Sequence, residues 1–130
     1  MPTRPDPSQG GSAVVEFALV LPLVLVVAMS LVQVGLLVRD RLLIEAAARA
    51  GARVAAVEAD EDAVRAAALA AAPDLDPTLA SVEVTRQGTQ GDPVTVSISY
   101  EEVVRVPLIG WLFGSSIHLE ATATDRQEFA

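Results

Sequence analysis

The stretch "GGSAVVEFALVLPLVLVV", residues 10–27, decides the fold, because it opens the longest apolar run in the chain. From Phe17 to Val38 that run is interrupted only by one proline, one serine, one glutamine and one glycine. As a helix it would be about 33 Å long, enough to cross a hydrocarbon core of about 30 Å. The run therefore predicts one membrane-spanning helix over about residues 17–38. Glu16 lies at its leading edge, and because a carboxylate inside a membrane costs about 2.5–3.5 kcal/mol, we expect it to have a specific role.

Composition limits what the rest of the chain can be. The protein has 130 residues, 52% of them hydrophobic, and a net charge of −8 from 17 acidic residues and nine arginines. The part outside the apolar run is large enough for one modest core. There is no cysteine, which excludes disulfides and thiolate metal sites. The cations are few and unclustered, so nucleic acid is not expected as a partner.

The kind of membrane segment and its orientation are separate questions. A cleaved secretory signal would be about 7–15 apolar residues long and end in a small-residue cleavage site, neither of which is found here. Arg39 and Arg41 follow the run directly, and a count of positive charges places the C-terminal side in the cytoplasm. The charge pattern alone does not fix the orientation, so the opposite side stays open.

The helix is expected to continue beyond the membrane to about Val57. Pro22 removes one backbone hydrogen bond and predicts a kink in the span. Beyond the span, apolar residues recur at alternating spacings of four and three, which predicts a heptad-like stripe on the half of the helix that lies against the domain. Its members are Leu43, Ala47, Ala50, Val54 and Val57. A helix over 12–57 would be about 69 Å long.

The C-terminal part predicts one short helix and a small sheet. Asp60 is placed to cap a helix that ends before Pro73. After that the apolar period changes to two in "SVEVTRQ" (81–87), "PVTVSISY" (93–100) and "SIHLEATAT" (116–124), with turn residues between the first two. We expect a three- to four-stranded antiparallel sheet packed on the outer half of the long helix, an α+β fold.

No constellation for catalysis, metal or cofactor binding is found in the sequence. The single histidine, His118, is predicted on the outward face of its strand, and Ser115 and Ser116 beside it do not form a nucleophile–base pair. The apolar segment "VPLIGWLFG", 106–114, is interpreted either as a partner-docking or membrane-touching loop or as a connection folded over the open end of the sheet. Its large side chains are Leu108, Ile109, Trp111, Leu112 and Phe113.

Order and spacing at the N-terminus resemble a known processing site. Gly11 is followed by four residues and then by Glu16 and Phe17, as in type IV prepilin-like proteins. With "EAAARAGARVAA" (45–56), the region resembles the TadE-like pseudopilins of tight-adherence pilus systems. The resemblance implies a pilin-like fold and cleavage between Gly11 and Ser12 by a prepilin peptidase. It also implies a leader over 1–11, a long helix over 12–57 and an extracytoplasmic domain over 58–130.

The same resemblance gives Glu16 a role. Cleavage would leave an α-ammonium group at Ser12, and Glu16 of one subunit could pair with that group of a neighbour, setting the axial register. The expected function is that of a minor pilin or pseudopilin in the inner membrane, with other pilus subunits, the assembly machinery and the lipid bilayer as partners. The alternative is an uncleaved, signal-anchored protein that presents a small binding domain.

Overall fold

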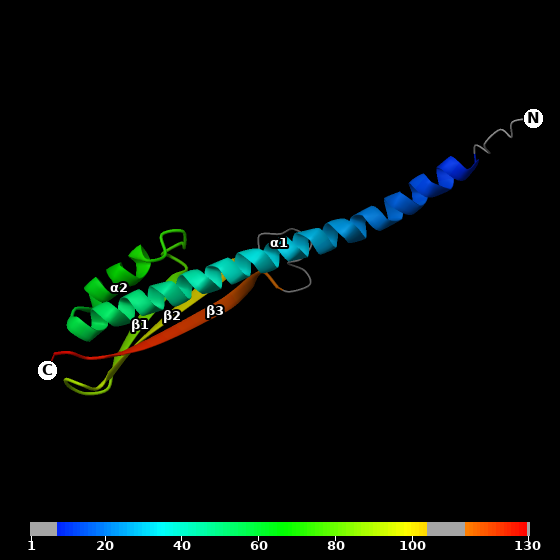
Figure 1. Cartoon of the computed structure of the whole chain (residues 1–130). Helices are drawn as coiled ribbons and strands as arrows, with labels where there is room; N and C mark the ends of the chain where they lie inside the picture. The colour runs from blue at the N-terminus through cyan, green and yellow to red at the C-terminus, as the bar shows by residue number, and fades with distance from the viewer. Residues whose placement is uncertain (1–7, 104–113, 130) are drawn as a thin grey trace, which may run out of the picture.

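The computed structural model describes residues 8–103 and 114–129. Its dominant element is α1, Ser8–Val57, a single helix of 50 residues (Figure 1). The helix ends at the predicted residue and begins four residues before the predicted Ser12. The small domain lies along the C-terminal half of α1, and the N-terminal half projects away from it.

A short second helix, α2, Glu61–Ala70, follows a tight turn at the end of α1. The side chain of Asp60 accepts a hydrogen bond from the backbone N–H of Asp62 at 3.0 Å, which satisfies one of the free donors of the first turn. Two acidic residues in the first turn favour the same helix end through its dipole. The predicted cap at Asp60 and the helix end before Pro73 are confirmed.

Three antiparallel strands form one sheet in the order β1-β2-β3. They are β1, Ala80–Arg86; β2, Pro93–Val103; and β3, Ser116–Arg126. The register pairs Val84 with Val96 and Val96 with Ala123, so the apolar positions of all three strands share one face. The predicted alternation is confirmed, and so is the α+β fold, with three strands among the described residues.

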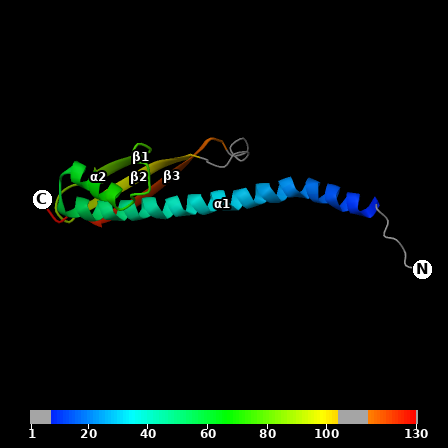
Figure 2. The ribbon, with the colours of Figure 1, turned by 90° about the horizontal axis from the view of Figure 1, so that it is seen from above.

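The inner face of the sheet packs against the outer half of α1, and α2 lies along the same part of that helix (Figure 2). At Gly51, both the sheet and α2 approach α1 closely. A Cβ atom at this position would lie 3.1 Å from Cγ1 of Val96 and 3.3 Å from Cβ of Ala68. The core is therefore built around small residues of α1 and larger ones of the sheet. Its fully buried members include Ile44, Ala55, Val64, Ala68, Val94 and Val96.

The predicted heptad-like stripe on α1 is confirmed only in part, because it lies along the edge of the face that the domain covers. Of its five members only Ala47 belongs to the buried core; Leu43, Ala50 and Val54 are half-buried, and Val57 is 57% exposed. The face that the domain covers is rotated about the helix axis and carries mostly alanine: Ile44, Ala47, Ala48, Gly51, Ala52, Ala55 and Ala56. Small side chains let α2 and the sheet approach α1 closely, so the smallest residues mark the true contact face.

Candidate assembly and processing site

The N-terminal part of α1 is exposed along the length over which its side chains are described. Every side chain from Gly11 to Met29 is exposed, a segment of about 28 Å along the helix. Glu16 is the only charged residue between Gly11 and Val38. By length and composition this is the one helix, among the described residues, that could cross a membrane, and none of its most apolar window is buried. Such a surface is stable only when lipid or other helices cover it.

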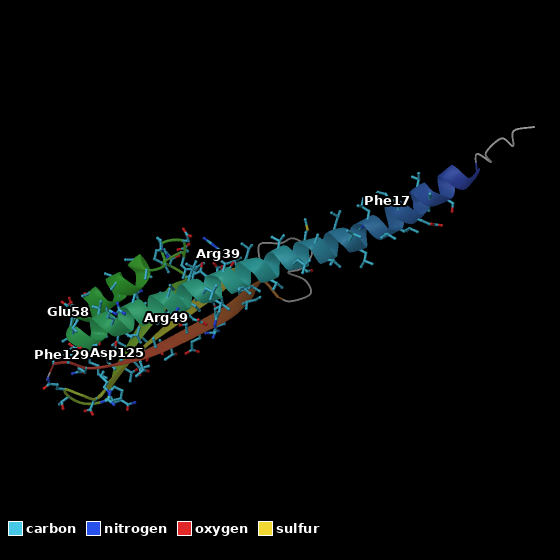
Figure 3. All side chains as sticks on the ribbon, viewed as in Figure 1. Phe17, Arg39, Arg49, Glu58, Asp125 and Phe129 are labelled. Carbon is cyan, nitrogen blue, oxygen red and sulfur yellow. The ribbon has the colours of Figure 1, made fainter. Side chains whose placement is uncertain are left out.

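Glu16 lies two turns from the start of α1. Its Oε1 atom accepts a hydrogen bond from the hydroxyl of Ser12 at 3.2 Å, one helical turn earlier. Phe17 beside it is 66% exposed and lies far from the domain (Figure 3). The helix thus places Ser12 and Glu16 on one face, with both side chains available to a neighbouring molecule.

Gly11 is exposed, and a Cβ atom added there would meet no atom within 4 Å. The bond between Gly11 and Ser12 lies inside α1, since the helix begins at Ser8. Two adjacent glycines, Gly10 and Gly11, weaken this first part of the helix by about 1 kcal/mol each relative to alanine. Local unwinding of the helix around this bond therefore costs little free energy.

Pro22 lies inside α1, and the helix continues through it without interruption. Figure 2 shows that α1 changes direction within its blue N-terminal third, the part that contains this proline. Proline lacks the backbone N–H and its ring crowds the preceding turn, which accounts for a bend there. Farther along the exposed segment, the Ser30 hydroxyl donates to the carbonyl of Val26 at 2.8 Å.

Two buried polar residues of α1 escaped sequence reasoning. Gln33 is 4% exposed and Asp40 is 7% exposed, seven residues apart on one face of the helix. Neither Nε2 nor Oε1 of Gln33 has a hydrogen-bond partner among the described residues. Gln33 lies within the predicted span. One face of α1 is therefore already buried at residue 33, before the apolar run ends at Val38. Gln33, Asp40 and the core residue Ala47 follow one another at intervals of seven residues, which places them on one helix face. This spacing could have indicated that the two polar residues are buried.

The arginines that follow the apolar run form ion pairs with the domain and along the helix. Arg39 pairs with Asp74, in the segment after α2, and lies 3.6 Å from the carboxylate of Asp40. Arg41 donates to Glu45 at 3.1 Å. These exposed pairs contribute little individually. The pair between Arg39 and Asp74 nonetheless connects α1 directly to the segment between α2 and β1.

A shallow groove lies between α1 and α2. We call it the basic groove; its volume is about 460 Å³ and its lining is Arg49, Ala50, Arg53, Val54 and Ala67. The apolar part of the lining includes two members of the predicted stripe. Nη1 of Arg49 lies 3.9 Å from Glu45, and Arg53 forms no ion pair with any described residue. The lining of the groove therefore combines apolar side chains with two positively charged ones.

The remaining features of the sequence analysis lie outside the assembly site. His118 is exposed on the outer face of β3, opposite Glu101 of β2. No group of three or more metal-ligating side chains lies together in the parts of the chain that the structure describes. The predicted partner loop, with Leu108, Ile109, Trp111, Leu112 and Phe113, lies outside the described residues.

These features define a class of protein: a single N-terminal apolar helix of membrane-spanning length that carries a small α+β domain on its far half. Within that class, residues 11–53 match the family model described as TadE-like protein. The match begins at Gly11 and ends within the outer half of α1, before α2. It confirms the resemblance seen in the sequence and suggests involvement in tight-adherence pilus assembly. No curated protein and no solved structure matches the chain.

Proposed function

We propose that the protein is a minor pilin or pseudopilin-type subunit of tight-adherence pilus assembly, a structural protein rather than an enzyme. In this proposal a prepilin peptidase removes residues 1–11, and the helix from Ser12 holds the mature chain in the inner membrane. The domain over residues 58–130 lies outside the cytoplasm. The observation that carries the proposal is a TadE-like match that starts at Gly11 on a helix with one charged residue, Glu16, in its exposed apolar segment.

The geometry of the helix start supports cleavage at this position. The peptidase must reach the bond after Gly11, and that bond lies in a weak, exposed, glycine-containing part of α1. Cleavage would free an α-ammonium group at Ser12, whose hydroxyl already lies 3.2 Å from Glu16. In a bundle of such helices, the carboxylate of Glu16 and a neighbour's ammonium group would compensate each other's loss of hydration.

The experiment is the intact mass of the full chain from membranes of cells with and without a prepilin peptidase. The proposal predicts loss of residues 1–11 only when the peptidase is present. Gly11→Leu should abolish the loss, and the matched variant Gly10→Leu should leave it intact. An unchanged mass in both kinds of cell contradicts the proposal and favours the uncleaved anchor.

The role of Glu16 needs a separate test. Glu16→Ala should remove the register contact, and we expect pilus assembly to fail although the mutant chain is still cleaved and inserted. Val15→Ala, a truncation at the neighbouring exposed position, is the control and should assemble normally. Normal piliation in the Glu16→Ala strain would contradict the assigned role.

A further inference from the structure

Charge is divided unevenly along the chain. Residues 39–57 carry four arginines against two acidic residues, whereas the chain from residue 58 onward carries thirteen acidic residues against four arginines. The outer half of α1 is therefore positive, and the sequence after it is strongly negative. Oppositely charged surfaces on one molecule can attract the complementary surface of another copy of itself.

The positive half has a feature that can receive a partner. The apolar part of the lining of the basic groove is Ala50, Val54 and Ala67, and these side chains are only half-buried. Arg53 of the same lining has no ionic partner among the described residues, and Arg49 has only a distant one in Glu45, at 3.9 Å. The groove thus offers partly open apolar surface together with available positive charge.

The acidic part of the chain has a segment of complementary chemistry, which we call the acidic turn. We define it as residues 57–62, from the last residue of α1 to the first two residues of α2. Val57 and Ala59 supply exposed apolar surface, and Glu58, Asp60, Glu61 and Asp62 supply the charge. Figure 3 shows Glu58 at the far end of α1, beyond Arg49. The carboxylates of Glu58 and Asp62 form no ion pair with described residues.

The acidic turn is held in a fixed shape. Arg86 of β1 donates from Nη2 to the backbone carbonyl of Glu58 at 2.8 Å, and its Nη1 lies 3.9 Å from Glu61. The guanidinium group of Arg86 also lies 5.9 Å from the ring centre of Phe129. A turn that is already ordered loses little conformational entropy when it binds, which favours its use as a docking element.

From this complementarity we propose that the basic groove binds the acidic turn of a second copy of this chain, lying parallel and displaced along the helix axis. To bring Glu58 of one copy level with Arg49 of the next, the displacement must be nine residues, about 13 Å. The contact is head-to-tail, so each copy uses its groove for one neighbour and its turn for another, and the array stays open.

A symmetric arrangement is disfavoured by the same charges. Two parallel copies in register would place Arg49 and Arg53 of one beside those of the other, which costs free energy. The nine-residue displacement also differs from the four residues between Ser12 and Glu16. Contacts at the groove and at Glu16 would accordingly be made with different neighbours, as in any helical array.

The test uses full-length chains with single cysteines, because the natural sequence has none. Two differently tagged copies, one with Ala67→Cys in the groove and one with Ala59→Cys in the turn, are made together in membranes without other pilus subunits. We expect a short cysteine crosslinker to join the mixed pair and to leave 67–67 and 59–59 pairs unjoined. Leader cleavage is not needed, so the outcome is independent of the proposed processing.

Charge reversal sharpens the result. Arg49→Glu in the groove copy should lower the mixed crosslink about fivefold, equivalent to about 1 kcal/mol, and Glu58→Arg in the turn copy should restore it. Arg126→Glu, an exposed reversal on β3, is the control and should have no effect. Folding of each variant is checked by circular dichroism of the purified full chain.

Three results would overturn the proposal. The first is a mixed pair of folded copies that fails to crosslink. The second is a 67–67 pair that crosslinks as well as the mixed pair, because that indicates a symmetric interface. The third is a mixed crosslink that does not change with Arg49→Glu, because it shows that charge complementarity does not direct the contact.

Discussion

The two halves of α1 belong to one unbroken helix but differ in which side chains they expose and which they bury. From Gly11 to Met29 the helix presents valine, leucine and other apolar side chains on every face, and none is buried. From Asp40 to Ala56 it presents to the domain a face made mostly of alanine, with Ile44 and Gly51, and it presents arginines to water. Large apolar residues on all sides suit lipid or other helices, whereas small residues on one side suit a closely packed domain.

The largest expected effect is the loss of stability when a large residue of α1 under the domain is truncated, compared with the truncation of an exposed residue of the same helix. Ile44 is fully buried, so Ile44→Ala should lower the free energy of unfolding of the domain by about 2–5 kcal/mol. Leu31 is 69% exposed on the same helix, and Leu31→Ala should change it by less than about 0.5 kcal/mol. Chemical denaturation of the full chain in detergent measures both. Equal losses would show that the two halves do not differ as described.

The glycines of α1 offer a second comparison, between a position that the domain covers and one that no other atom approaches. Gly51→Val would force side-chain atoms into Val96 and Ala68, and we expect a loss of about 1–3 kcal/mol in stability. A Cβ atom added at Gly35 would meet no atom within 4 Å, so Gly35→Val should be tolerated in the detergent-solubilised chain. Thermal unfolding followed by circular dichroism compares the two variants. A destabilised Gly35→Val with an intact Gly51→Val would reverse the assignment of the contact face.

A smaller effect is expected at the cap of α2. Asp60→Ala removes the acceptor for the N–H of Asp62 and should destabilise the domain by about 0.5–2 kcal/mol. Asp60→Asn keeps an acceptor oxygen and should retain most of that stability. The free energies of unfolding of the two variants, measured side by side, decide the point. If Asn were as damaging as Ala, the capping hydrogen bond would not be the cause.

The smallest effect concerns pH and the loop before β1. The side-chain hydroxyl of Thr78, and then its backbone N–H, bond to the Asp76 carboxylate and lower its pKa below the ordinary value. Because the folded pKa is the lower one, the contribution to stability is present above the unfolded pKa and is lost as pH falls through the folded pKa. Asp76 is fully exposed, so the contribution is small. In a carboxyl NMR titration, Thr78→Val should raise the Asp76 pKa; no rise would contradict the assigned cause.

Much of the domain was predictable because its signals are local. Alternation in 93–100 depends only on which side chains point to one face of a strand, and the structure buries Val94, Val96 and Ile98 accordingly. The cap at Asp60 likewise needs only the next two residues. The apolar run from Phe17 could likewise be identified from its length and composition alone, without knowledge of tertiary contacts.

The face of α1 that meets the domain was not predictable in the same way. Around residues 43–57 nearly every face of the helix carries alanine or valine, so two stripes fit a helical period equally well. The choice depends on tertiary contacts, above all the approach of Val96 and Ala68 to Gly51. The basic groove arises from the position of α2 beside α1, which is also a tertiary feature.

The most direct test of the difference between the halves is water accessibility in the membrane-embedded full chain. Leu25→Cys and Ala66→Cys both replace side chains that are exposed in the isolated molecule. With a water-soluble maleimide on membranes that are open to both sides, we expect Ala66→Cys on α2 to be labelled and Leu25→Cys to remain unlabelled until the membrane is dissolved. Labelling of Leu25→Cys as fast as that of Ala66→Cys in these membranes would contradict a helix with one half in lipid and the other half in its domain.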